Sequence, residues 1–526
     1  MSELREPVVS VRGGALRGFL VDGVTRPDGV TGPAGIAGPD AVNRPDGDDG
    51  SASRRIAAFL GVPYARAPVG PLRFRGPEPV EAWDGVRDAL AFGATAPKRP
   101  YKAPLDALLP DPDVAGENCL NLNVWAPWPP PLQDGPGAAS GRPVMVWIHG
   151  GSLVHGSSSL PVYDGEAFAR DGVVLVSLNY RLGIEGFRVF PDAPANLGLR
   201  DQLAALTWVR ENIEAFGGDP ERVTVFGESA GAISIAALLA SPLAKGLFRR
   251  AVLQSGAPMA LPLDRARRTT EAIAAHLGVA ATARALSAVP AERLLDAQTE
   301  VTGKGTPLTG GHSFQIAVDG EVLPRDPFEA LRDGSSADVD LLMGTNTEEH
   351  RLWFVPGRLV ERIGRLTLRV ALWRTKVPSR TVRAYRAARP GETPGELLGA
   401  LATDKLLRVP LNRLADARAA GPGATYVYEF GWRSPVLGLG ACHALEIGFV
   451  FDTLDRPGAA ALTGPDAPRP LAGAMHSAWV RFAATGDPGW RPWDASRPVM
   501  TFGRPGDDAP TLVESPREEE LRAWGD

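Results

Sequence analysis

Residues 222–240 read RVTVFGESAGAISIAALLA, and this stretch decides the fold class. Its first six residues are a nearly continuous apolar run, typical of a buried strand, while residues 230–240 have the small apolar side chains of a packed helix. The pentapeptide GESAG at 227–231 lies between them. Strand, sharp turn and helix in this order predict a nucleophile elbow, in which a strained turn presents the Ser229 hydroxyl. Because the chain contains 60 glycines, the pentapeptide alone carries little weight and its placement makes the prediction.

The same alternation of strand and helix continues on both sides. Helical spacing marks 199–216, and strand patterns occur at 144–150 (VMVWIHG), 173–180 (VVLVSLNY), 251–256 (AVLQSG) and 340–346 (DLLMGTN). Short connections between such elements predict an α/β fold with a large, mostly parallel sheet flanked by helices. We expect one domain over 1–526 with a small hairpin at 8–20. We also expect a flexible surface insertion at 22–53 and helical cap regions at roughly 264–320 and 350–420.

Composition describes an ordinary globular protein. Hydrophobic residues make up 44%, the net charge is −5 and the pI is about 5.9, which argues against a nucleic-acid partner. No run approaches the roughly 18 apolar residues of a spanning helix, so we expect no membrane partner. Residues 1–7 lack the apolar run of a secretory signal, and the two cysteines, Cys119 and Cys442, do not form a disulfide framework. These features predict a cytoplasmic protein.

A second Gly-rich turn follows the strand that ends at Ile148, with the sequence HGGS at 149–152. A plain tight turn would explain it, but it precedes the predicted elbow by one strand connection. There, the backbone N–H groups of Gly151, Ser152 and Ala230 would converge on the oxyanion of an acyl-transfer reaction. One such donor contributes about 3–4 kcal/mol to transition-state stabilisation.

A serine nucleophile needs a histidine base and an acid that orients it, in the chain order Ser, acid, His. Of seven histidines, His443 in GACHALE at 440–446 lies latest in a loop before an apolar run, which favours it as the base. The strand at 340–346 runs directly into Glu348 and Glu349. Either carboxylate fits the position of the acid, and spacing does not choose between them.

Several blocks of the chain resemble the type-B carboxylesterase family of the α/β-hydrolase superfamily, which includes bacterial para-nitrobenzyl esterases. They are FLGVPYARAPVGPLRFRGP at 59–77, GENCLNLNVWAP at 116–127, NYRLGIEGF at 179–187, the long block at 196–231 and HALEIGFVF at 443–451. The resemblance covers nearly the whole chain in the family order. It implies an α/β-hydrolase fold and a serine esterase that forms an acyl-enzyme with small to medium aryl or alkyl esters. It implies no metal or cofactor, and no partner beyond the small-molecule ester substrate.

Matched position by position, the resemblance implies Ser229 as nucleophile, His443 as base and Glu349 as acid, because the family's acid is the second of an acidic pair. It places Gly151, Ser152 and Ala230 in the oxyanion hole. Glu228 and Ser255 match polar residues that support the site from behind its catalytic side chains. Structural ion pairs are implied for Arg73 with Glu117 and for Arg181 with Asp201.

The chain departs from the family pattern at several positions. His350 replaces the usual Gly after the acid, and Ser152 replaces the commonest third Gly of the oxyanion loop. No cysteine precedes Cys119, so the family's N-terminal disulfide is absent. Leu109 and its neighbours lack the tryptophan of cholinesterases, which argues against choline esters. The aromatic residues Trp353, Phe354 and Trp373 fit either a substrate pocket or a core.

Two other functions fit the same sequence. A carbamate or amide hydrolase would use the same triad, since the attack and the oxyanion are alike. A non-catalytic binding module on this fold would not need Ser229, Glu349 and His443 to be intact.

Overall fold

A computed structural model describes residues 6–21, 55–130, 141–303 and 311–525. The expected hairpin is present as β1 (Val8–Val11) and β2 (Gly14–Arg17), which pair antiparallel. The insertion expected at 22–53 lies outside the described residues.

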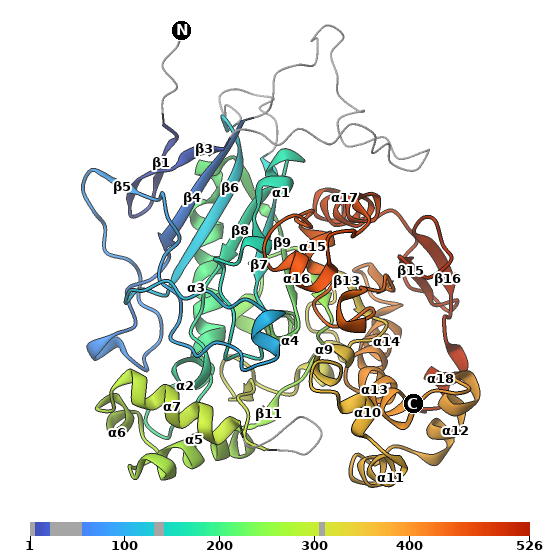
Figure 1. Ribbon diagram of the computed structural model, residues 1–526. Helices are drawn as coiled ribbons and strands as arrows, with labels where there is room; N and C mark the ends of the chain where they lie inside the picture. The colour runs from blue at the N-terminus through green and yellow to red at the C-terminus, as the bar shows by residue number, and fades with distance from the viewer. Residues whose placement is uncertain (1–5, 22–54, 131–140, 304–310, 526) are drawn as a thin grey trace, which may run out of the picture.

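One sheet of 11 strands dominates the described part of the chain, in the order β16-β15-β14-β13-β10-β9-β7-β8-β6-β4-β3 (Figure 1). The strands from β15 to β8 run parallel to their neighbours, and the outer pairs are antiparallel. The predicted mostly parallel sheet is therefore confirmed. The strands are β3 (Phe19–Val21), β4 (Arg55–Pro63), β6 (Asn121–Trp128), β7 (Arg142–Ile148), β8 (Val174–Leu178), β9 (Gly218–Glu228), β10 (Arg250–Gln254), β13 (Asp340–Asn346), β14 (Thr425–Phe430), β15 (Pro498–Phe502) and β16 (Thr511–Glu514).

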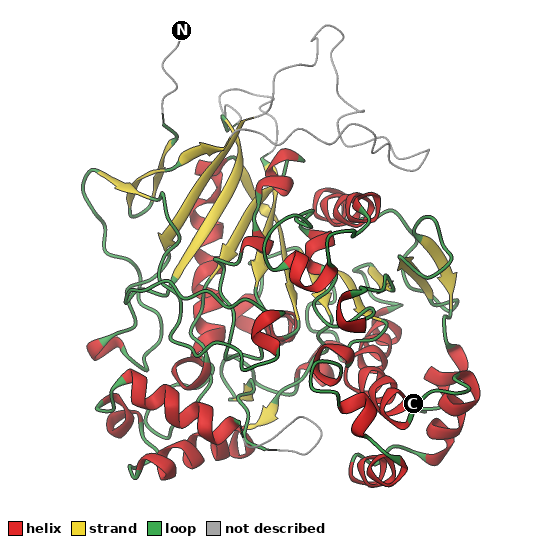
Figure 2. Ribbon diagram, viewed as in Figure 1, coloured by secondary structure: helices red, strands yellow, loops and turns green. Residues whose placement is uncertain are grey.

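Helices cover both faces of the sheet, as Figure 2 shows. In β7, Val144 and Val146 belong to one apolar core while Met145 and Trp147 belong to the other, because successive side chains of a strand point to opposite faces. This double burial explains the continuous apolar runs of the sequence. The first core includes α3 (Leu197–Asn212), α4 (Ala230–Ala240), α8 (Pro327–Arg332) and α14 (Val409–Arg418), and the second includes α1 (Glu166–Arg170), α15 (Ile447–Val450) and α17 (Arg469–Thr485).

Two further groups of helices lie beyond the sheet, at the lower left and lower right of Figure 1. The first contains α5 (Leu263–Leu277), α6 (Ala283–Ser287) and α7 (Ala291–Thr302). The second contains α9 (Arg351–Phe354), α10 (Leu359–Arg362), α11 (Arg365–Arg374), α12 (Ser379–Ala388) and α13 (Pro394–Thr403), and it has a small apolar core of its own. Among the described residues no helix has the length and apolar character needed to cross a bilayer.

Buried ion pairs tie the loops at the carboxyl ends of the strands together. Arg181 lies 2.6 Å from Asp201 with both side chains buried, as expected. The expected pair of Arg73 with Glu117 is wrong: Arg73 lies 2.6 Å from Glu185 in α2 (Gly183–Gly186). Glu117 is exposed, and the α2 turn brings Glu185 to Arg73 across 112 residues of chain, a proximity that sequence order does not reveal.

Candidate active site

Ser229 occupies the sharp turn between β9 and α4. Its backbone has φ 55° and ψ −121°, a conformation that a non-glycine residue adopts only under strain. The Ser229 N–H donates to the Gln254 carbonyl at the end of β10, 2.9 Å away, which holds the turn against the neighbouring strand. The side chain is partly exposed at the carboxyl end of the sheet. This is the geometry of the predicted elbow.

The two glycines of the pentapeptide lie where no larger side chain would fit. A Cβ on Gly227 would lie 2.5 Å from the Ile148 carbonyl oxygen, and a Cβ on Gly231 would lie 2.0 Å from the same atom. Both distances are far below van der Waals contact, so a larger residue would push α4 away from β7. Gly150 fills a third tight place, because a Cβ there would lie 3.3 Å from the Ser229 Cβ. The HGGS turn therefore lies directly beside the serine.

The structure brings Glu349 rather than Glu348 to His443. Glu349 follows β13, and its Oε2 lies 2.6 Å from His443 Nδ1. Its other oxygen accepts the Asn346 N–H at 2.7 Å, so the carboxylate is held from both ends. Glu348 turns away, accepts the Ala441 N–H at 2.9 Å and lies within 4 Å of two arginines.

Glu228 lies in direct contact with the imidazole of His443. Its Oε1 is 2.8 Å from His443 Nε2, but the contact is off the direction of a hydrogen bond. Within the described part of the chain, Nε2 has no hydrogen-bond partner, the Ser229 hydroxyl included. Ser255 is buried at the end of β10, and its hydroxyl likewise has no partner among the described residues.

Carboxylates dominate the electrostatics of His443. Burial alone would lower its pKa, but the charges of Glu228 and Glu349 together outweigh burial and raise the pKa of the imidazole well above its usual value. Burial in turn raises the pKa of Glu228, although His443 opposes this. The arrangement stabilises a positively charged imidazolium, the form that a base adopts after it takes a proton from serine.

The HGGS loop at 149–152, which the sequence predicts as part of an oxyanion hole, has an unusual backbone. Gly151 has φ 109° and Ser152 has φ 55°. The loop closes on itself, because the Gly151 carbonyl accepts the N–H groups of Val154 at 3.0 Å and His155 at 2.8 Å. Ala230 begins α4, so its N–H is among the first of the helix, which carry no intrahelical partner. Within the described residues, no hydrogen bond uses the N–H groups of Gly151, Ser152 or Ala230.

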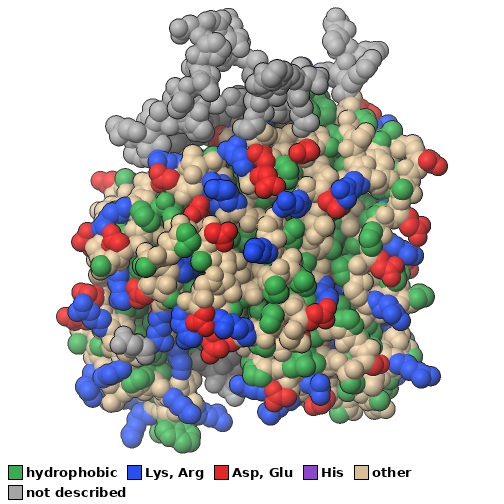
Figure 3. Space-filling model, turned by 180° about the vertical axis from the view of Figure 1, so that it is seen from behind, with side chains coloured by type: hydrophobic (Ala, Val, Ile, Leu, Met, Phe, Trp, Pro, Cys, Tyr) green, Lys and Arg blue, Asp and Glu red, His purple; other side chains and the backbone are tan. Residues whose placement is uncertain are grey.

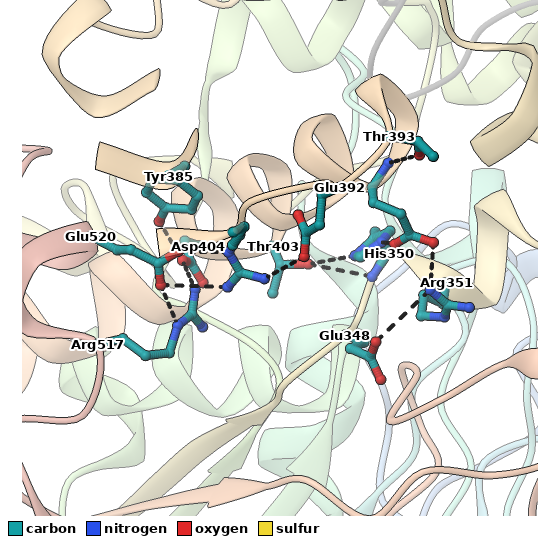
Figure 4. A network of polar contacts seen from close by, with 12 residues as sticks. Glu348, His350, Arg351, Tyr385, Glu392, Thr393, Thr403, Asp404, Arg517 and Glu520 are labelled. Atoms are coloured by element: carbon teal, nitrogen blue, oxygen red, sulfur yellow. Dashed lines mark hydrogen bonds and ion pairs between the residues drawn. The ribbon is translucent and has the colours of Figure 1, made fainter. Parts of the chain in front are cut away.

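His350 points into the second helical group, toward Thr403 (Figure 4). Its Nδ1 lies 3.4 Å from Thr403 Oγ1 and its Nε2 lies 3.2 Å from Glu396 Oε2, both on α13. A Cβ on Gly399 would lie 2.0 Å from the imidazole, so glycine opens the notch that receives the ring. His350 therefore anchors the turn that carries Glu349 to α13.

The three aromatic residues that fitted either a pocket or a core have different surroundings. The Trp353 ring lies over His443 with 4.7 Å between centroids and remains 44% exposed. Phe354 is buried in the core of the second helical group. Trp373 is 77% exposed on α11.

A model of the carboxylesterase family matches residues 46–501, most of the chain, including Ser229, Glu349 and His443. The chain belongs to the carboxylesterase family.

Individual carboxylesterases and related hydrolases are similar over nearly the full length. The para-nitrobenzyl esterase of Bacillus subtilis is 39% identical over 84% of this chain and 88% of its own. The phenmedipham hydrolase of Pseudarthrobacter oxydans is 38% identical over 82% and 87%, respectively. The solved carboxylesterase EST55 of Geobacillus stearothermophilus superposes with a TM-score of 0.80 at 35% identity, over 98% of this chain and 99% of that one. The protein is thus a carboxylic ester hydrolase of the serine carboxylesterase family.

In this carboxylesterase, sequence reasoning overlooked Glu446, a buried carboxylate that accepts a hydrogen bond from Asn346, as Glu349 does. Its Oε2 accepts from Asn346 Nδ2 at 2.7 Å and its Oε1 accepts from Gln254 Nε2 at 3.2 Å. Complete burial, followed by the charges of Glu228 and Glu349, raises its pKa to about 8. The available signal was an acidic residue three positions after His443, directly before the apolar run IGFVF.

Proposed function

We propose that this carboxylesterase hydrolyses esters in two steps through an acyl-enzyme on Ser229. The observation that carries the proposal is the 2.6 Å contact between Glu349 and His443 at the same sheet edge as the strained serine turn. His443 Nε2 takes the proton from Ser229 as Oγ attacks the ester carbonyl. The same nitrogen returns that proton to the departing alcohol, and water then cleaves the acyl-enzyme by the same route.

Three backbone N–H groups are proposed to hold the oxyanion, those of Gly151, Ser152 and Ala230. Their support is the positive-φ loop beside Ser229 and the start of α4, where unpaired N–H groups and the helix dipole favour negative charge. Ser152 serves as well as glycine in this role because only its backbone N–H is used.

Glu228 and Glu349 are proposed to divide the charge of the imidazolium between them. Glu349 orients the ring through Nδ1, while Glu228 lies beside Nε2 and favours the protonated form. Because the Glu228 contact is not a hydrogen bond, Nε2 is free to meet the serine hydroxyl when substrate is bound, and catalytic hydrogen bonds commonly tighten at that stage.

Small to medium aryl or alkyl esters are the proposed substrates. Trp353 supports this, since its half-exposed ring covers the base that must protonate the leaving alcohol. An apolar leaving group would pack against that ring. We further propose that the whole chain is one domain, and that the regions at roughly 264–320 and 350–420 form its cap.

A cytoplasmic location is proposed from the cysteines. Cys119 and Cys442 are both buried and unpaired, which is typical of a protein from a reducing compartment. Burial raises the pKa of the Cys119 thiol to about 12, so this thiol stays protonated and unreactive.

A substrate panel measured with Ser229→Ala tests the reaction. The panel contains aryl and alkyl esters, a carbamate, an anilide and phenmedipham, the last because a similar hydrolase is named for it. We expect ester turnover by the unmodified enzyme to exceed anilide turnover, and Ser229→Ala to lower kcat/KM at least a thousandfold.

Ser234→Ala is the matched control, since it also removes a serine hydroxyl, on the helix that follows the elbow, and this hydroxyl has no hydrogen-bond partner in the described structure. We expect it to change kcat/KM less than about threefold. Unchanged ester turnover in Ser229→Ala would remove the serine from the mechanism. A preference for the carbamate or the anilide would instead reassign the substrate class while keeping the triad.

A further inference from the structure

Helix α11 presents an apolar stripe to solvent. Leu366, Val370 and Trp373 are 74%, 47% and 77% exposed, and their spacing of four and three residues places them on one face. The helix does not need this face for folding, because Leu368 on its other side is 2% exposed and fills the core of the second helical group. Three large apolar side chains gathered on one exposed helix face indicate an interaction surface.

Unpaired cations surround the stripe. Residues 358–376 contain six basic side chains and one acid, Glu361, which lies 2.8 Å from Arg358. The other five are exposed and form no ion pair within the described ranges: Arg362, Arg365, Arg369, Arg374 and Lys376. The net charge of −5 for the whole chain conceals this local excess.

The surroundings of the stripe include a hollow. Two further exposed cations, Arg383 and Arg386, lie on the following helix, α12. An open hollow adjoins the stripe and is lined by Leu372, Trp373, Arg374, Lys376 and Val377. In Figure 3, where the view is reversed, the corresponding rim at the lower left shows Lys and Arg side chains around a hydrophobic projection.

We propose that this α11 surface binds an anionic phospholipid membrane from outside the bilayer. A stripe of Trp, Leu and Val between arginines is the pattern of a helix that lies in the plane of a membrane interface. The arginines would meet the lipid phosphates while the apolar side chains enter the boundary between headgroups and acyl chains. At ten residues the helix is about 15 Å long, enough for such a contact and far too short to span.

A second copy of the chain fits this surface poorly. In a two-fold dimer the same five unpaired cations of each copy would face one another, and like charges brought together destabilise an interface. An anionic membrane instead complements both the charge and the apolar stripe. The expectation of no membrane partner followed from the absence of a long apolar run, and a peripheral helix needs only a stripe.

Co-sedimentation of the full chain with lipid vesicles tests the proposal. One set of vesicles is pure phosphatidylcholine, and the other contains about one third phosphatidylglycerol. We expect binding to the anionic vesicles only, at least tenfold above the neutral ones at about 0.1 M salt. It should weaken steeply toward 1 M salt, where the Debye length falls from about 10 Å to about 3 Å.

Two variants separate the two parts of the surface. Arg365→Gln, Arg369→Gln and Arg374→Gln together should weaken binding roughly a hundredfold, at about fivefold for each cation. Leu366→Ser, Val370→Ser and Trp373→Ser together should weaken it at least tenfold. Both variants should hydrolyse a water-soluble aryl ester at the unmodified rate, which shows that they are folded.

Matched controls change similar side chains elsewhere. Arg265→Gln, Arg268→Gln and Arg293→Gln remove three exposed cations of the first helical group, and Leu243→Ser removes a leucine that is 50% exposed. Neither should alter vesicle binding.

Three results would overturn the proposal. The first is equal or no binding to the two kinds of vesicle. The second is a dimer in solution that dissociates when Leu366, Val370 and Trp373 are replaced by serine, which would assign the stripe to a second copy. The third is tight binding to polyglutamate that displaces vesicles and that is unchanged when the three apolar side chains are replaced by serine. This result would assign the surface to an acidic polypeptide.

Discussion

The imidazole of His443 lies between two carboxylates, and this sets the conditions under which it works. Glu349 contacts Nδ1 at 2.6 Å, and Glu228 contacts Nε2 at 2.8 Å. Both favour the protonated ring, so in the proposed mechanism they stabilise the imidazolium of the transition state. They also raise the pKa of the imidazole, so that the ring is protonated, and unable to accept a proton, up to a higher pH. The base must be neutral to accept a proton, so activity should fall as the pH drops through the raised pKa.

Glu228→Gln tests this balance. Removing one carboxylate lowers the pKa of His443, so the acidic limb of the profile of kcat/KM against pH should move to lower pH. The measurement is hydrolysis of an aryl ester between about pH 4 and 9. Glu348→Gln is the control, because Glu348 follows β13 next to Glu349 but accepts from the Ala441 N–H instead of contacting His443. An acidic limb that stays in place in Glu228→Gln would show that this carboxylate does not act on the base.

At the scale of elements, contacts with α13 hold the turn after β13 that carries Glu349. His350 explains the connection: it replaces the family's usual glycine next to Glu349 and fills a notch that Gly399 leaves open. The hydrogen bond with His350, together with the charge of Arg351, outweighs burial and lowers the pKa of Glu396. Sequence alone left His350 unexplained because its partners lie about fifty residues away, in a helix whose docking no local pattern describes.

Gly399→Ala should damage this contact. The new Cβ would meet the His350 ring at 2.0 Å, and overpacking of this kind costs about 1–3 kcal/mol of the free energy of unfolding. Thermal unfolding should therefore begin at lower temperature, and ester hydrolysis should weaken as the acid turn shifts. Adding His350→Ala to Gly399→Ala should recover part of the loss. Gly364→Ala is the control, since a Cβ there meets nothing within 4 Å. Equal effects of Gly399→Ala and Gly364→Ala would mean that the notch does not position the turn.

At the scale of the whole molecule, loops at the carboxyl ends of distant strands must be held in one arrangement. The buried pair of Arg181 and Asp201 does this, because Asp201 accepts both the Arg181 backbone N–H at 3.0 Å and the guanidinium. The guanidinium also donates to the Arg75 carbonyl at 2.7 Å, which joins a third loop.

Asp201→Ala should therefore be severely destabilising. It leaves a buried guanidinium without its counter-charge, and breaking such a pair costs about 3–5 kcal/mol. Glu221→Ala, which removes one partner of an exposed pair with Arg210, should cost less than about 1 kcal/mol. Urea unfolding of the two variants, followed by circular dichroism, gives the comparison. Similar midpoints would show that the buried pair contributes no more than a surface contact.

Much of this architecture was accessible from the sequence, for identifiable reasons. Parallel strands buried on both faces appear in the sequence as continuous apolar runs, and the strained turn appears as a serine flanked by glycines. The sheet and the elbow at Ser229 were therefore predicted. Contacts between distant loops produce no local pattern in the sequence. Arg73 was paired with the wrong acid, and Glu446 was overlooked because its role depends on where the chain folds back.

Labelling of the full chain with a fluorophosphonate, followed by peptide mass spectrometry, tests the central claim most directly. The reagent traps a serine only when a neighbouring base activates it and an oxyanion site accepts the phosphoryl oxygen. We expect one adduct, on Ser229, formed rapidly by the unmodified enzyme and lost in His443→Ala. An adduct on another residue, or none on the folded protein, would contradict the account.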